Sequence, residues 1–98
     1  MLGELTERIV RLVDGRAAFG FDVIFDLGDD GVILVRGSSQ PIAVSNDNEN
    51  ADTKFEINAA DLRSMLTGEL APMMAYMQGK LKIDGDLSQA MQISSLFA

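Results

Sequence analysis

The sequence contains no cysteine and no histidine among its 98 residues. Without these side chains the protein lacks a thiol nucleophile, an imidazole general base and the usual ligands of zinc. No disulfide can form, so cysteine places no constraint on the redox compartment. These absences remove the commonest catalytic and metal-binding chemistries and leave carboxylates as the only abundant reactive groups.

Positive charge is also scarce. Eight Lys and Arg residues stand against fifteen Asp and Glu residues, which gives a net charge of −7 and a pI near 4.3. A nucleic-acid binder needs a basic stripe that displaces counterions from phosphates, whereas these basic residues are spread singly along the chain. We therefore expect no nucleic-acid partner. The same negative field disfavours firm docking on anionic lipid, so we expect at most a transient hydrophobic contact with a membrane.

The chain has no long uninterrupted hydrophobic run. Charged residues interrupt the apolar pattern of residues 1–14, whereas a signal peptide needs an unbroken apolar segment and a spanning helix needs about 20 apolar residues. We therefore expect a cytoplasmic protein. The length suits one domain, residues 1–98, and a chain of this size buries roughly 60–65% of its unfolded surface. A sizeable internal cavity would then require a functional reason.

The first half of the sequence predicts a helix followed by a β-meander. Apolar residues recur at helical spacing over residues 2–14, with charged residues on the other side. Residues 19–27 alternate with period two, which indicates a strand with one buried and one wet face, Ile24 being the exception on the wet face. The buried face comprises Phe19, Phe21, Val23, Phe25 and Leu27. A hairpin turn then leads to strands at 32–36 and 42–44.

The second half alternates strand, helix and turn signals. Strands are predicted at 53–57 and 80–84, Asn58 and Asp86 are placed as helix N-caps, and Pro72 suits the first turn of a short helix. Strands grouped apart from helices indicate an α+β fold. In such a fold the helices cover one face of a mainly antiparallel sheet.

No arrangement of polar residues predicts a reaction. The acidic loop at 45–52 contains no glycine, whereas a calcium loop needs one at its sixth position and a glutamate at its twelfth. A phosphate loop fails because Met74 stands where a glycine is needed ahead of Gly79-Lys80. Spacing singles out no pair of carboxylates, and the serines have no histidine to activate them. We therefore expect no catalytic residue, no metal site and no cofactor, so the protein is not predicted to be an enzyme.

Methionine is the distinctive residue of the second half. Of the six methionines, Met73, Met74, Met77 and Met91 lie in two of the predicted helices. Methionine side chains are unbranched and polarizable, so they adapt to partners of variable shape. Facing the phenylalanine-rich strand, they would form a deformable wall of a ligand pocket. The alternative is an ordinary core filling, which composition alone favours.

Much of residues 55–97 consists of the segments F-E-I-N-A-A-D-L, P-M-M-A-Y-M-Q-G-K-L-K-I-D-G-D and L-S-Q-A-M-Q-I-S-S-L-F. This sequence resembles the C-terminal half of the sterol carrier protein 2 (SCP-2) domain family, and the first half agrees in the order of its elements. The resemblance implies a five-stranded, mostly antiparallel sheet with helices packed on one face around an apolar cavity. It also implies a domain that binds a fatty acid, acyl-CoA or sterol-like lipid without catalysis. The small, standalone and acidic form of the chain suggests a bacterial member.

The resemblance and the residue pattern together predict a lipid site between the first strand and the helices. The predicted ligand-binding residues are Ile9, Val13, Phe21, Val23, Phe25, Met73, Met74, Met77, Ile83, Met91 and Phe97. We expect the last helix to lift during exchange, with Met91 and Phe97 at the gate. The alternative is an accessory or interaction domain with a filled core, which acts in lipid or quinone metabolism without carrying a ligand. A homodimer is left open in both cases.

Overall fold

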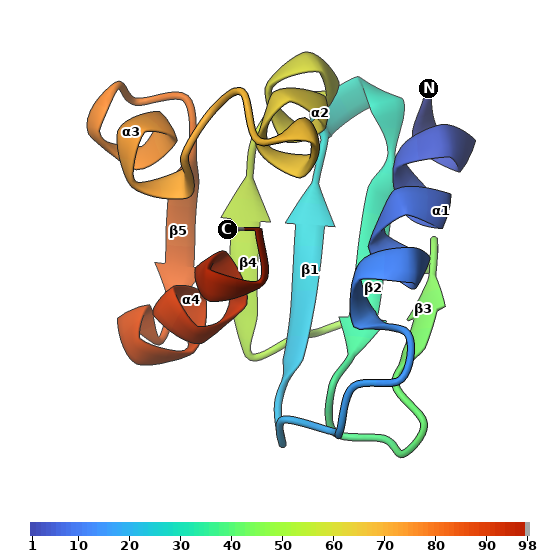
Figure 1. Ribbon diagram of the computed structural model, residues 1–98. Coiled ribbons are helices and arrows are strands. Elements are labelled where there is room, and N and C mark those ends of the chain that lie inside the picture. The colour runs from blue at the N-terminus through green and yellow to red at the C-terminus, as the bar shows by residue number, and fades with distance from the viewer. Residues whose placement is uncertain (98) are drawn as a thin grey trace.

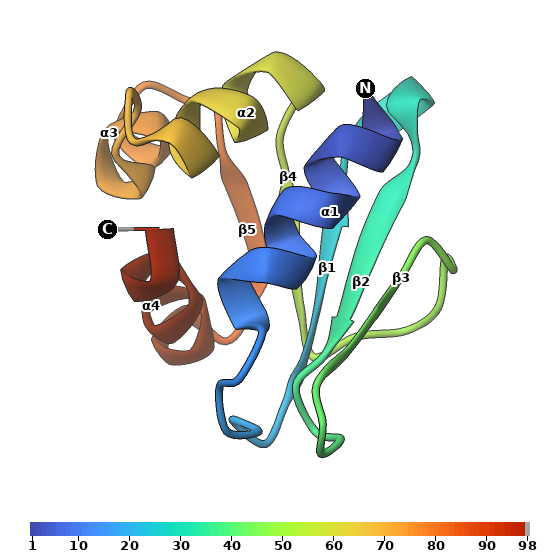
Figure 2. The same ribbon diagram turned by 45° about the vertical axis from the view of Figure 1, so that its right-hand side comes forward.

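The computed structural model describes residues 1–97. Four α-helices and two 3-10 turns accompany a five-stranded sheet. In chain order the elements are α1 (Leu2–Val13), β1 (Asp22–Asp26), η1 (Gly28–Asp30), β2 (Val32–Arg36), β3 (Ala43–Ser45), β4 (Thr53–Glu56), α2 (Ala59–Thr67), α3 (Pro72–Met77), β5 (Lys82–Gly85), α4 (Leu87–Ser94) and η2 (Ser95–Phe97). All four helices lie on one face of the sheet (Figures 1 and 2), which confirms the predicted α+β layer.

The sheet has the strand order β3-β2-β1-β4-β5. The pairs β1–β2, β2–β3 and β4–β5 are antiparallel, as the predicted meander requires, and β1–β4 is parallel. Nothing in the local sequence pattern predicts this central parallel pair. It arises because the chain leaves the β3 edge, crosses the sheet through residues 46–52 and enters β4 on the far side of β1. The central strand β1 thereby has a neighbour on both edges.

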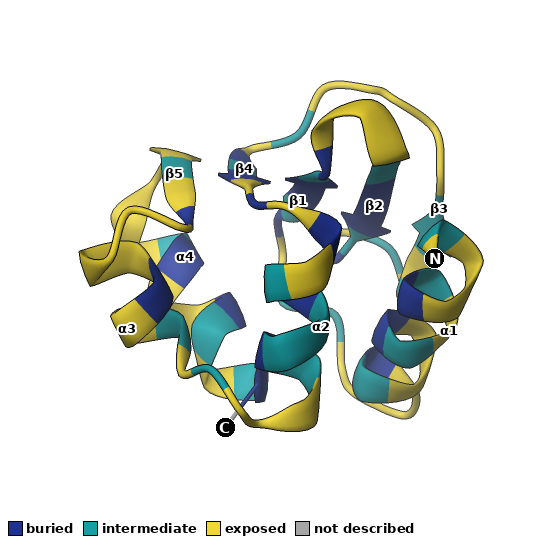
Figure 3. Ribbon diagram, turned by 90° about the horizontal axis from the view of Figure 1, so that it is seen from above, coloured by how far each residue is buried: buried dark blue, intermediate teal, exposed yellow. Residues whose placement is uncertain are grey.

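The hydrophobic core lies between the sheet and the helices, with Phe25 at its centre. The Phe25 ring makes edge-to-face contacts with Phe55 on β4, at 5.2 Å between ring centroids, and with Phe97 in η2, at 6.1 Å. From the opposite layer, α1 buries Leu5 and Ile9 on its sheet-facing side. Figure 3 shows the buried side of each helix turned toward the strands. Residues from the N-terminal helix α1 and from the C-terminal turn η2 therefore pack into the same core.

The second face of the sheet is covered in part by the polar loop 46–52, which runs along it (Figure 3). Ile24 and Leu34 pair across β1 and β2 on this face, and both are buried. Ile24 lies beside loop residues 48–52 in a shallow polar pocket. We predicted that this face of β1 is exposed to water. At Ile24 the prediction is wrong, because the loop shields its side chain.

Candidate functional site

An open groove of about 440 Å³ lies between α3, β5 and α4. Apolar side chains from all three elements form most of its wall. The lining residues are Ala71, Pro72, Met73, Tyr76, Leu81, Ile83, Leu87, Ala90, Met91, Ser94 and Ser95. None of these side chains is charged, and Tyr76, Ser94 and Ser95 supply the only polar side chains. The volume falls in the range of about 300–1,000 Å³ that is typical of ligand pockets.

Helix α3 buries only its smallest side chain. Ala75 is fully buried, and its carbonyl oxygen accepts hydrogen bonds from the backbone N–H of Lys80 at 2.9 Å and of Leu81 at 3.1 Å. Pro72 at the first helical turn sets the direction of the helix. Because Ala75 is the buried residue of α3, the large side chains of this helix lie on its exposed sides. Met73 and Tyr76 therefore form one wall of the groove while remaining 64% and 50% exposed.

Helix α4 forms the opposite wall and is anchored at its first turn. The Asp86 carboxylate accepts hydrogen bonds from the backbone N–H of Ser88 at 2.8 Å and of Gln89 at 3.3 Å, as expected for an N-cap. The hydroxyl of Thr53, which is fully buried on β4, donates to the Gln89 side-chain oxygen at 2.8 Å. Ala90 and Ile93 face the core. Leu87 and Met91, one helical turn apart, remain exposed along the groove.

The space beneath α4 is almost completely filled. It has a volume of about 10 Å³, which is room for at most one water molecule. Its walls are Ile9, Leu12, Val13, Val23, Phe25, Val35, Ile93, Leu96 and Phe97. No lipid chain fits there in this conformation. Phe97, expected at a gate, is 8% exposed and packs into the core.

The predicted ligand residues fall into separate groups instead of surrounding one space. Met73, Ile83 and Met91 line the groove. Met74 and Met77 are exposed on α3 outside the groove lining. Buried in the core are Ile9, Val13, Phe21, Val23, Phe25 and Phe97. We expected the methionines of α3 to face the phenylalanines of β1. This is wrong, because α3 lies beside the edge strand β5 and buries only Ala75.

Some groove residues were missed by the sequence analysis. Leu81 was missed although it alternates with the predicted Ile83 along the same strand, so their shared face was readable from the sequence. Leu87 lies four residues before Met91, which is the spacing of neighbours on one helix face. Nothing in the pattern indicated that these two faces would meet.

A second groove, of about 360 Å³, lies on the other side of α4. Ile93 and Leu96 contribute to it from the C-terminal part of the chain, and Phe19 and Ile42 from the other side. Arg16 also lines it, so this groove, unlike the first, includes a charged residue. Helix α4 is thus bordered by a groove on each flank and covers the small filled space between them.

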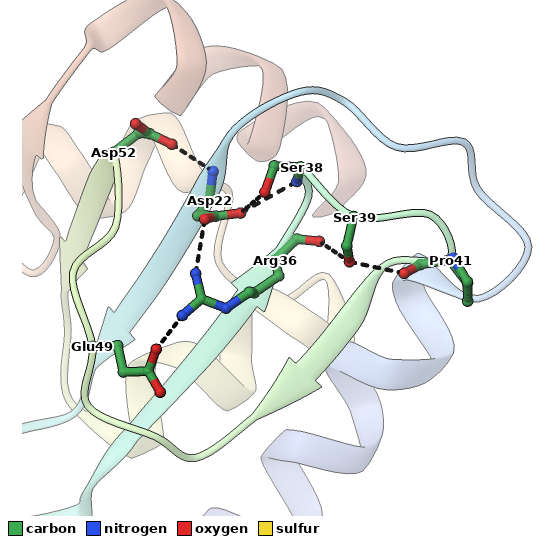
Figure 4. Close-up of polar contacts among 7 residues, drawn as sticks. All are labelled: Asp22, Arg36, Ser38, Ser39, Pro41, Glu49 and Asp52. Atoms are coloured by element: carbon green, nitrogen blue, oxygen red, sulfur yellow. Dashed lines mark hydrogen bonds and ion pairs between the residues drawn. The ribbon is translucent and has the colours of Figure 1, made fainter.

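A network of hydrogen bonds and ion pairs lies on the opposite face of the sheet, around Asp22 (Figure 4). Burial raises the pKa of the Asp22 carboxyl, but hydrogen bonds from Ser38 and Arg36 outweigh it and hold the pKa below its ordinary value. Arg36 also pairs with Glu49. The backbone N–H of Asp22 donates to the Asp52 carboxylate, and the backbone N–H of Asp52 donates to the Asp22 carbonyl oxygen. The network fastens the loop 46–52 to the sheet.

Elsewhere on this face, a hydrogen bond to the Asp26 carboxylate raises the pKa of Lys54 above its ordinary value. Over residues 1–97, no group of three or more acidic side chains is arranged to hold a metal ion. Within the same residues, no helix is long and apolar enough to cross a membrane.

Replacing Asp22 with asparagine should destabilise the protein by about 1–2 kcal/mol at neutral pH, because charged hydrogen bonds from Ser38 and Arg36 are weakened. A carboxyl whose pKa is lowered by folding stabilises the folded state above its unfolded pKa, and the stabilisation is lost as the pH falls through the folded value. The gap between wild type and Asp22→Asn should therefore narrow below about pH 4. Urea unfolding across a pH series measures it.

Asp47→Asn is the matched control, because Asp47 is an exposed acid of the loop 46–52 and the substitution changes the same charge. Its effect on unfolding should be near zero at every pH. A gap for Asp22→Asn that stays constant from neutral to acidic pH would contradict the role assigned to the carboxylate.

Solved structures of other proteins have a similar fold. A crystal structure of Sterol Carrier Protein 2 Like 2 from Aedes aegypti has a TM-score of 0.74 to this chain at 18% identity, covering 96% of this chain and 94% of that one. A solution structure of the palmitated protein from the same organism gives 0.67 at 15% identity, covering 98% and 89%. At these sequence identities, both comparisons show a shared fold.

The sequence places the chain in a family. A model of the SCP-2 sterol transfer family matches residues 11–98, and the chain belongs to this family. Sterol carrier protein 2 of Gallus gallus is 35% identical over 65 residues, which are 66% of this chain. The matched region spans only 12% of that relative, so the activities of the longer protein do not transfer with the match.

Proposed function

We propose that this domain binds a single-chain lipid, such as a fatty acid or its thioester, in the groove between α3, β5 and α4, and that it does so without catalysis. The observation that carries the proposal is the groove itself: a continuous apolar surface from three elements with no charged side chain in its lining. Membership of the SCP-2 sterol transfer family supports the ligand class. The palmitated state of the Aedes aegypti protein, which has the same fold, supports an alkyl chain as the ligand.

Affinity in such a groove comes from burying apolar area on the ligand and on the wall. Each buried methylene contributes about 0.8 kcal/mol, or about a fourfold change in affinity. Flexible methionines at Met73 and Met91 allow the wall to follow chains of different shape. We therefore expect affinity to rise steadily with chain length and selectivity between neighbouring lengths to be weak.

We expect the groove to bind its ligand without catalysing a reaction. Tyr76 is the only titratable side chain in the groove lining, and Ser94 and Ser95 have no base beside them there. The groups with shifted pKa values, Asp22 and Lys54, lie on the opposite face of the sheet. Polar atoms of the groove are thus suited to orienting a headgroup and not to activating a nucleophile.

The competing function is an interaction domain with a filled core. The filled space beneath α4 favours it over an internal tunnel in this conformation. It does not account for the groove, whose exposed Leu87, Met91 and Met73 gain burial only when something occupies it. Titration with a lipid separates the two functions, because a filled interaction domain has no saturable site.

Met91→Gln should weaken binding of a fluorescent fatty acid about fivefold, since a groove methionine that contacts the chain is worth about 1 kcal/mol when partly buried. Met77→Gln is the matched control. It makes the same change at a similarly exposed position, 71% against 62%, outside the groove lining. Its affinity should equal that of wild type. Absence of saturable binding in wild type, or equal losses in both variants, would refute the groove as the site.

A further inference from the structure

Methionine sulfur is the most readily oxidised group in this protein. The chain contains six methionines but no cysteine, histidine or tryptophan, so no thiol, imidazole or indole competes for an oxidant. A peroxide converts the thioether of methionine to a sulfoxide, and exposure of the side chain governs how readily it reacts. The burial of each methionine therefore decides which of the six are oxidised.

The methionines fall into two groups by exposure. Met65 on α2 is 1% exposed and packs in the core. The other five have exposed fractions between 46% and 71%. A peroxide in solution should reach these five, whereas Met65 should react only when the protein unfolds. Met65 is thus an internal reference for the integrity of the core.

Two of the exposed methionines face each other across the groove. Met73 on α3 is 64% exposed and Met91 on α4 is 62% exposed, and both line the groove. A sulfoxide oxygen at either position would accept hydrogen bonds from water. An alkyl chain that covers this oxygen removes the water without replacing its hydrogen bonds, which is unfavourable. No charged side chain in the groove lining can take the place of that water.

We propose that Met73 and Met91 are oxidation sites through which a peroxide releases the lipid from the groove. With hydrogen peroxide, the sulfur lone pair attacks one oxygen, the O–O bond breaks, an S–O bond forms and the second oxygen leaves as water. The sulfur is oxidised by two electrons and the peroxide is reduced by two. The release rests on the proposed lipid function, whereas the oxidation of these sites does not.

Oxidation at these two positions should leave the fold intact. Helix α3 buries only Ala75, and α4 buries Ala90 and Ile93, so neither methionine packs in the core. In the empty groove each sulfoxide can be hydrated. The cost therefore arises only when a ligand binds, so oxidation lowers affinity without unfolding the domain. Methionine sulfoxide reductases return the sulfoxide to the thioether, which makes the change reversible.

Treatment of the whole chain with hydrogen peroxide tests the proposal. Mass spectrometry of the peptides should show added oxygen at Met73 and Met91 and none at Met65. Titration with a fluorescent fatty acid should show affinity reduced about fivefold for each oxidised groove methionine, or about 25-fold for both, since each loses a partly buried apolar contact. The melting temperature should change little.

Two double variants assign the effect to the groove. Met73→Leu/Met91→Leu keeps both walls apolar and removes both oxidation sites, so it should bind the fatty acid before peroxide and keep its affinity afterwards. Met74→Leu/Met77→Leu is the matched control, because it removes two exposed methionines of α3 that lie outside the groove lining. It should lose affinity on oxidation as wild type does.

Any of three results would overturn the proposal. The first is that Met73 and Met91 stay unmodified under conditions that oxidise Met65. The second is that doubly oxidised wild type binds as tightly as untreated protein. The third is that Met73→Leu/Met91→Leu loses affinity as strongly as wild type. If untreated wild type does not bind the fatty acid, the proposed function fails and the release fails with it, while the mass spectra still test the oxidation sites on their own.

Discussion

Replacing Phe25 with alanine is expected to lower the free energy of unfolding by about 3–5 kcal/mol. Phe25 is 2% exposed and contacts Phe55 and Phe97 edge to face, so the truncation removes two aromatic contacts and leaves a cavity at the centre of the core. A domain of this size has a total stability of about 5–15 kcal/mol. The variant should therefore be close to unfolding at ambient temperature, as thermal denaturation followed by circular dichroism would show.

The same variant tests whether the lipid binds in the groove or in the core. At low temperature, where the remaining fold is populated, Phe25→Ala should bind a fatty acid as wild type does, because Phe25 does not line the groove. Phe19→Ala is the control for losing a ring at a less buried position, since Phe19 contacts Phe21 at 4.7 Å but is only half-buried. It should cost less stability than Phe25→Ala. A large change in affinity with Phe25→Ala would instead place the ligand in the interior.

Blocking the groove should have the largest effect on binding. Ser94 lines the groove from the last turn of α4 and is half-buried, so Ser94→Trp places an indole in the space meant for the alkyl chain. Excluding about three methylenes at about 0.8 kcal/mol each weakens binding by about 60-fold. The measurement is titration with a fluorescent fatty acid, with the melting temperature checked to show that α4 keeps its place.

Ser88→Trp is the matched control for this substitution. Ser88 lies on the same helix, is exposed and is outside the groove lining. Its affinity for the fatty acid should remain within a factor of two of wild type, as a rough expectation for a surface change away from the site. Equal losses from both tryptophans would show that the effect comes from disturbing α4 and would remove the support for a blocked groove.

Local signals predicted much of the fold. Asn58 accepts from the backbone N–H of Asp61 at 2.8 Å and begins α2, and Asp86 caps α4 as predicted. The period-two alternation around Phe25 correctly gave the core face of β1. These features are readable because a cap or an alternating strand is specified by residues a few positions apart.

Features that depend on distant segments were not readable. The parallel pairing of β1 and β4, and the burial of Ile24, follow from the path of the polar loop 46–52, which carries no local sign of its destination. The direction of α3 was also hidden. In P-M-M-A-Y-M apolar residues occupy every side of the helix, so periodicity does not select the buried one. In the structure Ala75 is the buried residue of α3, and the methionines of this helix are exposed.

The six methionines offer the most direct test of the lipid site. In protein labelled with 13C at the methionine methyl groups, titration with palmitate should move the signals of Met73 and Met91 and give contacts from both methyls to the alkyl chain. Met65, 1% exposed on α2, reports on the core and should stay unchanged, as should Met77 outside the groove. Shifts confined to Met65, or no shift at any methionine at saturating palmitate, would contradict a lipid site between α3, β5 and α4.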